Sequence, residues 1–229
     1  PTHRLDSVRT VNIADKIGTT VTNSPTGDAK TLFPLQAALG YNLAQSLFIG
    51  HNNLVVEGVT DFWFLTTVSA HLSDIGKVAL LPDLTLTPAG GAQKVSYMVT
   101  LLTSESLNVL VLFDTEKESE TTKNELLKAK LIHERNVVFV SEAFNPAPSE
   151  ADIEDLLDPS VYESLVKEAY KVELKGKSLQ FNEKIPRIAK RVEKAFEALG
   201  IPFHKTRPAR LFLKKMANEP DKVLTSASL

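Results

Sequence analysis

The sequence predicts an α/β fold in which helices flank a parallel β-sheet and a helical attachment follows at the C-terminus. Two observations lead to this prediction. Between residues 54 and 140, short apolar runs rich in β-branched residues alternate with segments of helical periodicity, which is the pattern of βα units in a parallel sheet. Beyond Pro159 the apolar residues recur at the spacing of amphipathic helices.

The elements follow in a regular order along the chain. Residues 1–30 are polar and predict a short strand, a turn and a loop, and leucines at helical spacing predict a helix over 32–48 with Pro34 in its first turn. We then predict strands at residues 54–57, 85–88, 109–113 and 137–140, a further short strand at 78–81, and helices at 61–73, 91–102, 119–132, 161–174 and 185–199. Gly200 is expected to close the last helix as its C-cap.

The charge distribution separates the C-terminal part from the rest. Residues 161–217 contain ten Lys and four Arg against six Glu and no Asp, which is a formal charge of +8. The net charge of the chain is −2, so the remaining residues carry −10. A basic segment beside an acidic one suggests a phosphate-binding arm next to a metal site. A pair of solvated amphipathic helices explains the same charges equally well. We expect three parts: a connecting segment (1–50), an α/β domain (51–159) and a basic helical domain with a tail (160–229).

Composition excludes several classes of protein. The chain has no cysteine, which rules out disulfides, thiolate zinc sites and cysteine nucleophiles and favours a reducing compartment, so we expect a cytoplasmic location. No apolar segment approaches the ~20 residues of a membrane span, and we expect no signal peptide. There is no Walker A glycine loop, so we expect no ATP hydrolysis by this segment. Because the sequence starts at Pro1, we expect it to be part of a longer protein.

Acidic residues follow the two most apolar runs. One run ends at Glu57-Gly58 with Asp61 close behind, and the other ends at Asp114-Thr115-Glu116. Ligands of open α/β sheets bind beyond the carboxyl ends of the strands, so we expect these four acids at one edge. Packed carboxylates repel one another unless a cation lies between them, and all-oxygen clusters suit Mg²⁺ or Mn²⁺. Taken singly, Glu57 or Asp61 could equally well favour the positive end of the following helix.

These motifs resemble those of a known domain. Glu57-Gly58, Asp114-x-Glu116 and the acidic segment 150–158, in this order, resemble the Toprim domain of topoisomerases, bacterial primases and several nucleases. The segments LVVEGVTDFWFL, TPAGGAQKVSYMV, VLVLFD and EADIEDLLDP are similar to the C-terminal half of OLD-family nucleases, most closely class 2. In that family the Toprim domain follows an ABC-type ATPase domain and carries a helical attachment. The resemblance therefore implies that residues 51–159 are a Toprim catalytic domain and that residues 1–50 include the tail of an ATPase region.

The resemblance also implies a metal centre that binds two Mg²⁺ or Mn²⁺ ions. Its implied ligands are Glu57, Asp61, Asp114, Glu116, Asp152 and Glu154. Glu116 stands where most Toprim domains have aspartate, so it could bind the metal directly or through water. Glu150 is an alternative to Asp152 or Glu154, because Ser149 with Asp152 three residues later also fits a capping box.

Two segments are candidates for contacts with DNA. Gly90 and Gly91 precede a predicted helix that carries Lys94, and backbone N–H groups of such a turn can bind a phosphate. An ordinary glycine-assisted turn is the alternative explanation. In the basic part, we expect Arg207 and Arg210 to contact backbone phosphates.

A lysine from the helical attachment is implied by the resemblance. Such a cation could stabilise charge that develops during phosphoryl transfer. We assign this role to Lys205, with Lys214 and Lys215 as alternatives, and simple tethering of phosphates would be the lesser role of all three.

The sequence thus predicts a metal-dependent DNA nuclease, cutting internally or from ends, with Glu57, Asp114 and Lys205 as catalytic residues. One alternative is a Toprim scaffold that binds nucleic acid without cutting it. Another is a topoisomerase-like transesterase, which needs a nucleophilic tyrosine from among Tyr41, Tyr97, Tyr162 and Tyr170 or from another domain. Trp63 is predicted to belong to the core, with base stacking as the alternative.

Overall fold

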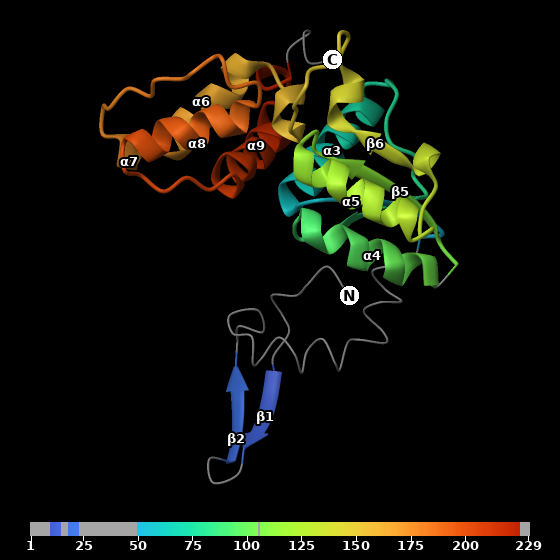
Figure 1. Cartoon of the computed structure of the whole chain (residues 1–229). Coiled ribbons are helices and arrows are strands. Elements are labelled where there is room, and N and C mark those ends of the chain that lie inside the picture. The colour runs from blue at the N-terminus through green and yellow to red at the C-terminus, as the bar shows by residue number, and fades with distance from the viewer. Residues whose placement is uncertain (1–9, 15–17, 23–49, 105, 225–229) are drawn as a thin grey trace. The chain divides into compact units, whose positions relative to one another are not determined.

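The structure is a computed structural model that describes residues 10–14, 18–22, 50–104 and 106–224 (Figure 1). The chain divides into two compact units, Pro1–His51 and Asn52–Leu229. In the first unit, β1 (Thr10–Ala14) pairs antiparallel with β2 (Gly18–Thr22), which agrees with the predicted polar strand and turn. The helix predicted over 32–48 lies outside the described residues.

The second unit is built on a four-stranded parallel sheet with the order β4-β3-β5-β6. Its strands are β3 (Asn52–Val56), β4 (Leu84–Pro88), β5 (Asn108–Phe113) and β6 (Val137–Phe139). The chain passes from β3 to β4 on one side and then crosses back to β5 on the other side of β3. This reversal creates a topological switch point between β3 and β5, which is where α/β sheets bind their ligands.

Three helices cover the faces of this sheet. They are α3 (Val59–Asp74), α4 (Ala92–Ser104) and α5 (Lys117–Lys128). Crossovers between parallel strands are right-handed, which places α3 on one face and the neighbouring helices α4 and α5 on the other (Figure 1). Val55 and Val56 of the central strand β3 are completely buried between these layers, as expected for a parallel strand covered on both faces.

The C-terminal residues form the predicted helical attachment. It contains α6 (Pro159–Ala169), α7 (Lys171–Leu174), α8 (Ile188–Ala198) and α9 (Thr206–Asn218). Its core shares side chains with the sheet layer, because Phe212 of α9 packs on Phe64 of α3 with ring centroids 4.5 Å apart. The structure thus confirms an α/β, Toprim-like parallel sheet flanked by helices with a helical C-terminal part. The predicted boundary at residue 160 falls at the start of α6, inside one compact unit.

Some local predictions are wrong. Residues 78–81 form no strand, and Val78 is 92% exposed, because an apolar run of four residues does not by itself create a strand partner. The predicted helix over 161–174 is interrupted at Tyr170, and α9 begins at Thr206, in a part of the chain where the sequence predicts no helix. Pro208 is tolerated there since the first turn of a helix lacks N–H partners.

The short remaining elements in the described residues of the second unit are four 3₁₀ helices. They are η2 (Glu134–Asn136), η3 (Val140–Ala143), η4 (Ile153–Leu156) and η5 (Pro220–Lys222). None of the helices in the described part of the chain combines the length and the apolar character needed to cross a membrane.

Candidate metal centre

Glu57 lies directly after β3 and faces the loop that follows β5. Its Oε1 atom accepts hydrogen bonds from Ser119 Oγ (2.7 Å) and from the Asp114 backbone N–H (3.1 Å). Burial raises the pKa of Glu57 to about 7; the Ser119 hydrogen bond opposes this shift, and the nearby charges of Asp61 and Glu116 add to it. The two strand ends that the sequence predicted to converge are therefore joined through this carboxylate. Sequence reasoning missed Ser119, which carries no motif of its own.

Asp61 combines the two roles that its position suggested. Its carboxylate accepts the Gly58 N–H at 2.7 Å and so caps the start of α3. The side chain is also buried and belongs to the same electrostatic cluster as Asp152 and Lys205. Burial raises the pKa of Asp61 above its ordinary value, while the Gly58 hydrogen bond and the Lys205 charge oppose the shift.

Asp114 connects the second strand end to the third acidic segment. Its Oδ1 accepts the Ile153 N–H at 3.2 Å. Next to it, Thr115 and Ala151 form an isolated antiparallel bridge with N–O distances of 2.7 and 3.1 Å. Burial raises the pKa of Asp114 well above its ordinary value, and the charges of Asp61 and Asp152 add to this effect. The loop after β5 and the segment around residue 152 are thus held together.

Asp152 and Glu154 are both fully buried in this segment. Burial raises the pKa of Glu154 to about 7, although the charge of Lys205 opposes the shift. The capping box lies three residues later than the one predicted from Ser149 and Asp152. Asp152 is the N-cap residue, and its backbone N–H donates to the Asp155 carboxylate at 2.7 Å. Glu150 is exposed, so the structure favours Asp152 and Glu154 over it as members of the cluster.

Two cations of the helical attachment reach these acids. Lys205, the residue before α9, places Nζ 3.3 Å from Asp152 Oδ2 and 3.2 Å from Glu154 Oε2. Burial would lower the pKa of Lys205, but the charges of Glu154 and Asp152 outweigh it and raise the pKa, so the ammonium stays charged. Arg187, just before α8, pairs with Glu116 and lies 2.8 Å (Nε) from Asp152 Oδ1.

Sequence reasoning missed Arg187 because it stands in a loop without periodicity or motif. The alternatives to Lys205 lie elsewhere: Lys215 pairs with Glu168 at 2.5 Å, and Lys214 is exposed. Lys205 is therefore the lysine that the fold brings to the acids. We call Glu57, Asp61, Asp114, Glu116, Asp152 and Glu154 the acid centre.

The glycine turn before α4 differs from our expectation. The N–H groups of Gly90 and Gly91 both donate to the Glu57 carbonyl oxygen, at 3.0 and 2.7 Å. In this structure the two N–H groups are therefore engaged within the chain and not free to bind a phosphate, and a contact of Gly90, Gly91 or Lys94 with DNA stays a prediction. Both residues have positive φ, +86° and +125°, a conformation that favours glycine. The turn ties the start of α4 to Glu57 instead, and Lys94 is exposed beside it.

The two predicted phosphate contacts in α9 have different surroundings. Arg207 donates to Glu173 Oε1 (2.6 Å) and to the Ala169 carbonyl (2.7 Å), and its guanidinium stacks 3.9 Å above the Tyr170 ring. This residue fastens α9 to the end of α6, so a free phosphate-binding role for it is not supported. Arg210 is exposed and lies 5.9 Å from the Trp63 ring centroid.

The donor set of the acid centre fits a hard divalent cation by its chemistry. Six carboxylates face two cations, and the buried Oε1 of Glu154 has no hydrogen-bond partner among the described residues. An excess of buried negative charge is the condition that Mg²⁺ and Mn²⁺ relieve. Within the described residues, no three Asp, Glu or His side chains are grouped closely enough to hold an ion. The acids nearest to the helical attachment pair instead with Lys205 and Arg187.

No model of a known protein family matches the chain, and no curated protein matches it significantly. The functional argument therefore depends on the residues of the acid centre and their surroundings.

Proposed function

We propose that this chain is a divalent-metal-dependent DNA nuclease and forms the catalytic half of an ATPase-nuclease of the OLD type. The observation that carries the proposal is the arrangement of the acid centre. Its carboxylates lie near the carboxyl edge of a parallel sheet, at the switch point between β3 and β5, and the ammonium of Lys205 pairs with two of them. Buried acids with raised pKa values beside a fixed cation are typical of functional sites.

Glu57, Asp61, Asp114, Asp152 and Glu154 are the residues that would hold the ions. Two bound divalent ions would supply an activated water and stabilise the leaving oxygen of the phosphodiester. The chain itself orients these ligands: Ser119 and the Asp114 N–H fix one oxygen of Glu57. Lys205 would offer a positive charge to the phosphoryl oxygens, where phosphoryl transfer gains most from preorganised charge. Glu116, paired with Arg187, would act on the centre indirectly.

A non-cleaving nucleic-acid scaffold is the second candidate, and one observation favours it. Lys205 and Arg187 already neutralise part of the acid centre by direct ion pairs, so these cations could serve in place of metal ions. The transesterase alternative has less support. Tyr162 and Tyr170 are fully buried, and Tyr97, although 72% exposed, lies on α4. Tyr41 lies outside the described residues.

A plasmid-nicking assay tests the proposal. We expect the chain to convert supercoiled DNA to nicked and linear forms with Mg²⁺ or Mn²⁺, without nucleotide, and to lose this activity in EDTA. Asp114→Asn should be inactive, whereas Glu120→Gln, an exposed change on α5, should cut normally. If the chain stays inert toward supercoiled, linear and single-stranded DNA with Mg²⁺, Mn²⁺ and Ca²⁺, yet binds DNA, the scaffold is the better description.

A further inference from the structure

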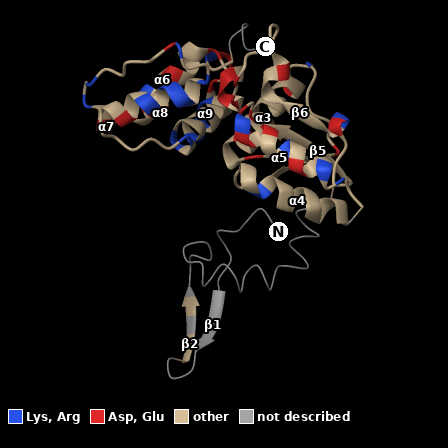
Figure 2. Cartoon of the chain, viewed as in Figure 1, with Lys and Arg blue, Asp and Glu red and all other residues tan. Residues whose placement is uncertain are grey.

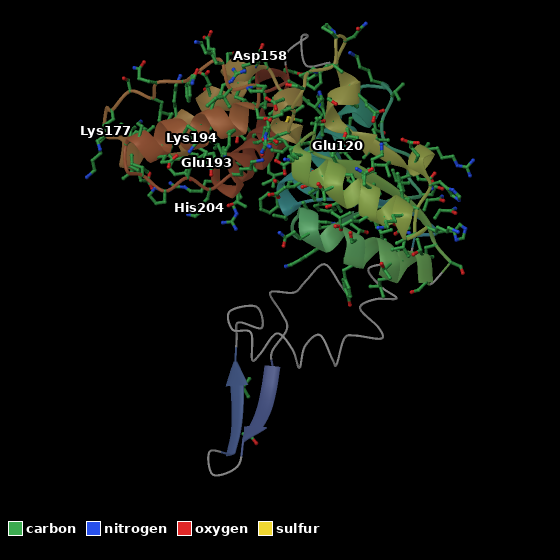
Figure 3. All side chains as sticks on the ribbon, in the orientation of Figure 1. Glu120, Asp158, Lys177, Glu193, Lys194 and His204 are labelled. Carbon is green, nitrogen blue, oxygen red and sulfur yellow. The ribbon has the colours of Figure 1, made fainter. Side chains whose placement is uncertain are left out.

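Helix α9 differs from the other basic helix in how its charges are used. On α8, cations pair with acids of the same helix, as in Lys190–Glu193 (2.5 Å) and Lys194–Glu197 (2.6 Å), and Glu193 and Lys194 lie side by side on this helix in Figure 3. The segment Thr206–Asn218 of α9 contains four cations and no acid. These ion pairs cancel much of the charge of α8 within the helix, whereas α9 has no acid of its own. Figure 2 shows Lys and Arg on both helices.

Two of the four cations on α9 are free to bind an anion. Arg207 and Lys215 are paired with Glu173 and Glu168. Arg210 and Lys214 are exposed and have no carboxylate partner in the part of the chain that the structure describes. They are four residues apart, so they lie on one face of the helix and about 6 Å apart along its axis. This spacing suits successive phosphates of an extended strand.

An aromatic ring lies beside this cationic face. Trp63 of α3 is only partly buried, at the margin of the contact between α3 and α9, and its ring is the one that Arg210 approaches. Trp63 follows Asp61 of the acid centre by two residues, which is about 3 Å along the axis of α3. Arg210 follows Lys205 by five residues, which is about 7.5 Å along the axis of α9. Cations that track a backbone beside an accessible aromatic ring are features of single-strand binding sites, and the Trp63 ring is partly accessible.

We propose that Trp63, flanked by Arg210 and Lys214, binds an unpaired nucleobase of the substrate strand. The inference rests on the proposed nuclease function and specifies its substrate: a DNA end or region in which at least one base near the cleaved phosphate is unstacked. The base would stack on the free part of the Trp63 ring, and the two cations would hold the adjoining phosphates. Paired bases of a blunt duplex cannot reach the ring without being unstacked.

Trp63 is the only tryptophan of the chain, so its fluorescence reports on this site alone. The wild-type chain, in EDTA to prevent cleavage, is titrated with single-stranded oligo(dT), with a blunt duplex of equal length, and with an abasic strand that has the same phosphates. We expect quenching by oligo(dT) and little change with the duplex or the abasic strand. Anisotropy of labelled strands measures binding by each ligand independently of Trp63.

Substitutions extend the test. Trp63→Leu should weaken oligo(dT) binding about 5- to 150-fold, the usual effect of losing one stacked base, and should leave the abasic strand unaffected. Trp63→Phe keeps a ring and should retain most of the affinity, which excludes misfolding as the cause. Arg210→Gln should weaken binding of both strands. Lys194→Gln, the matched loss of a paired cation on α8, should weaken neither.

The outcomes separate this inference from the proposed function. Binding of oligo(dT) with unchanged Trp63 emission, or equal affinities of wild type and Trp63→Leu, would show that Trp63 only packs α3 against α9, and the nuclease proposal would stand. Absence of binding to every form of DNA would contradict both.

Discussion

Replacing Glu57 by glutamine should stabilise the folded chain at alkaline pH. The carboxyl group has an ordinary pKa of 4.5, and burial raises it to about 7 in the folded chain. A shift of one unit corresponds to about 1.36 kcal/mol, so the displacement amounts to about 3 kcal/mol. Glu57 is only 8% exposed, and this estimate therefore needs little correction for solvent screening.

The sign of the effect follows from proton binding. Below pH 4.5 the group is protonated in both states and contributes nothing. Between pH 4.5 and 7 the folded chain binds more protons than the unfolded chain, so the free energy of unfolding falls as the pH rises. Above pH 7 the full penalty is present. Glutamine carries no charge, and its oxygen can still accept the hydrogen bonds from Ser119 and the Asp114 N–H.

Urea unfolding in EDTA at pH 4.5, 6 and 8, followed by Trp63 fluorescence, measures this effect. Glu57→Gln should unfold with a free energy close to that of wild type at pH 4.5 and up to about 3 kcal/mol higher at pH 8. Glu120→Gln is the control, since this residue is exposed on α5 (Figure 3) and should follow wild type. The reasoning fails if Glu57→Gln is no more stable than wild type at pH 8, or if its advantage is independent of pH.

Three further outcomes are expected. Binding of Mn²⁺ near pH 6.5 should release protons, measured by calorimetry in buffers of different ionisation enthalpy, because Glu57 and Glu154 have pKa values of about 7 without metal; equal heats in all buffers would contradict this. Lys205→Ala should lower the saturated single-turnover cleavage rate on the order of 10²–10³-fold, with little loss of DNA affinity. Lys214→Ala should chiefly weaken DNA binding. Equal cleavage rates for wild type and Lys205→Ala would show that Lys205 has only a structural role. Arg210→Glu should weaken DNA binding and flatten its salt dependence. Arg207→Glu should mainly lower the Tm, because it breaks the contacts of Arg207 with α6 and α7. A larger loss of DNA binding for Arg207→Glu than for Arg210→Glu would show that Arg207 faces the DNA.

Apart from the strand at 78–81, which does not form, the sequence was sufficient to predict the succession of strands and helices along the chain around the acid centre. Its two most informative signals were local: an apolar run followed at once by Glu57, and another followed by Asp114. Parallel strands end at the same edge, so these acids had to meet once β3 and β5 were in one sheet. The strand order itself, which makes β3 and β5 direct neighbours, depends on long-range packing and was not predicted.

The contacts of Lys205 and Arg187 with the acid centre were harder to predict from the sequence. Lys205 was placed by resemblance, whereas Arg187 lies in a loop whose path is determined by packing of the helical attachment. The amides of Gly90 and Gly91 illustrate the same limit, because their use depends on the Glu57 carbonyl more than 30 residues away. A residue pattern indicates which groups a segment offers, but not which of them the rest of the chain has already engaged.

The acid centre is assembled from two halves of opposite charge that are separate along the chain. All six carboxylates precede residue 155, and both of their cationic partners, Arg187 and Lys205, come from the helical attachment. A ribosome adds about 5–20 residues per second, so the carboxylates emerge seconds before either partner. An incomplete chain carries these acids without their counter-ions, and it gains a finished site only when α9 docks on α3. Truncated products of synthesis that end before α9 would therefore lack the ion pairs that complete the acid centre.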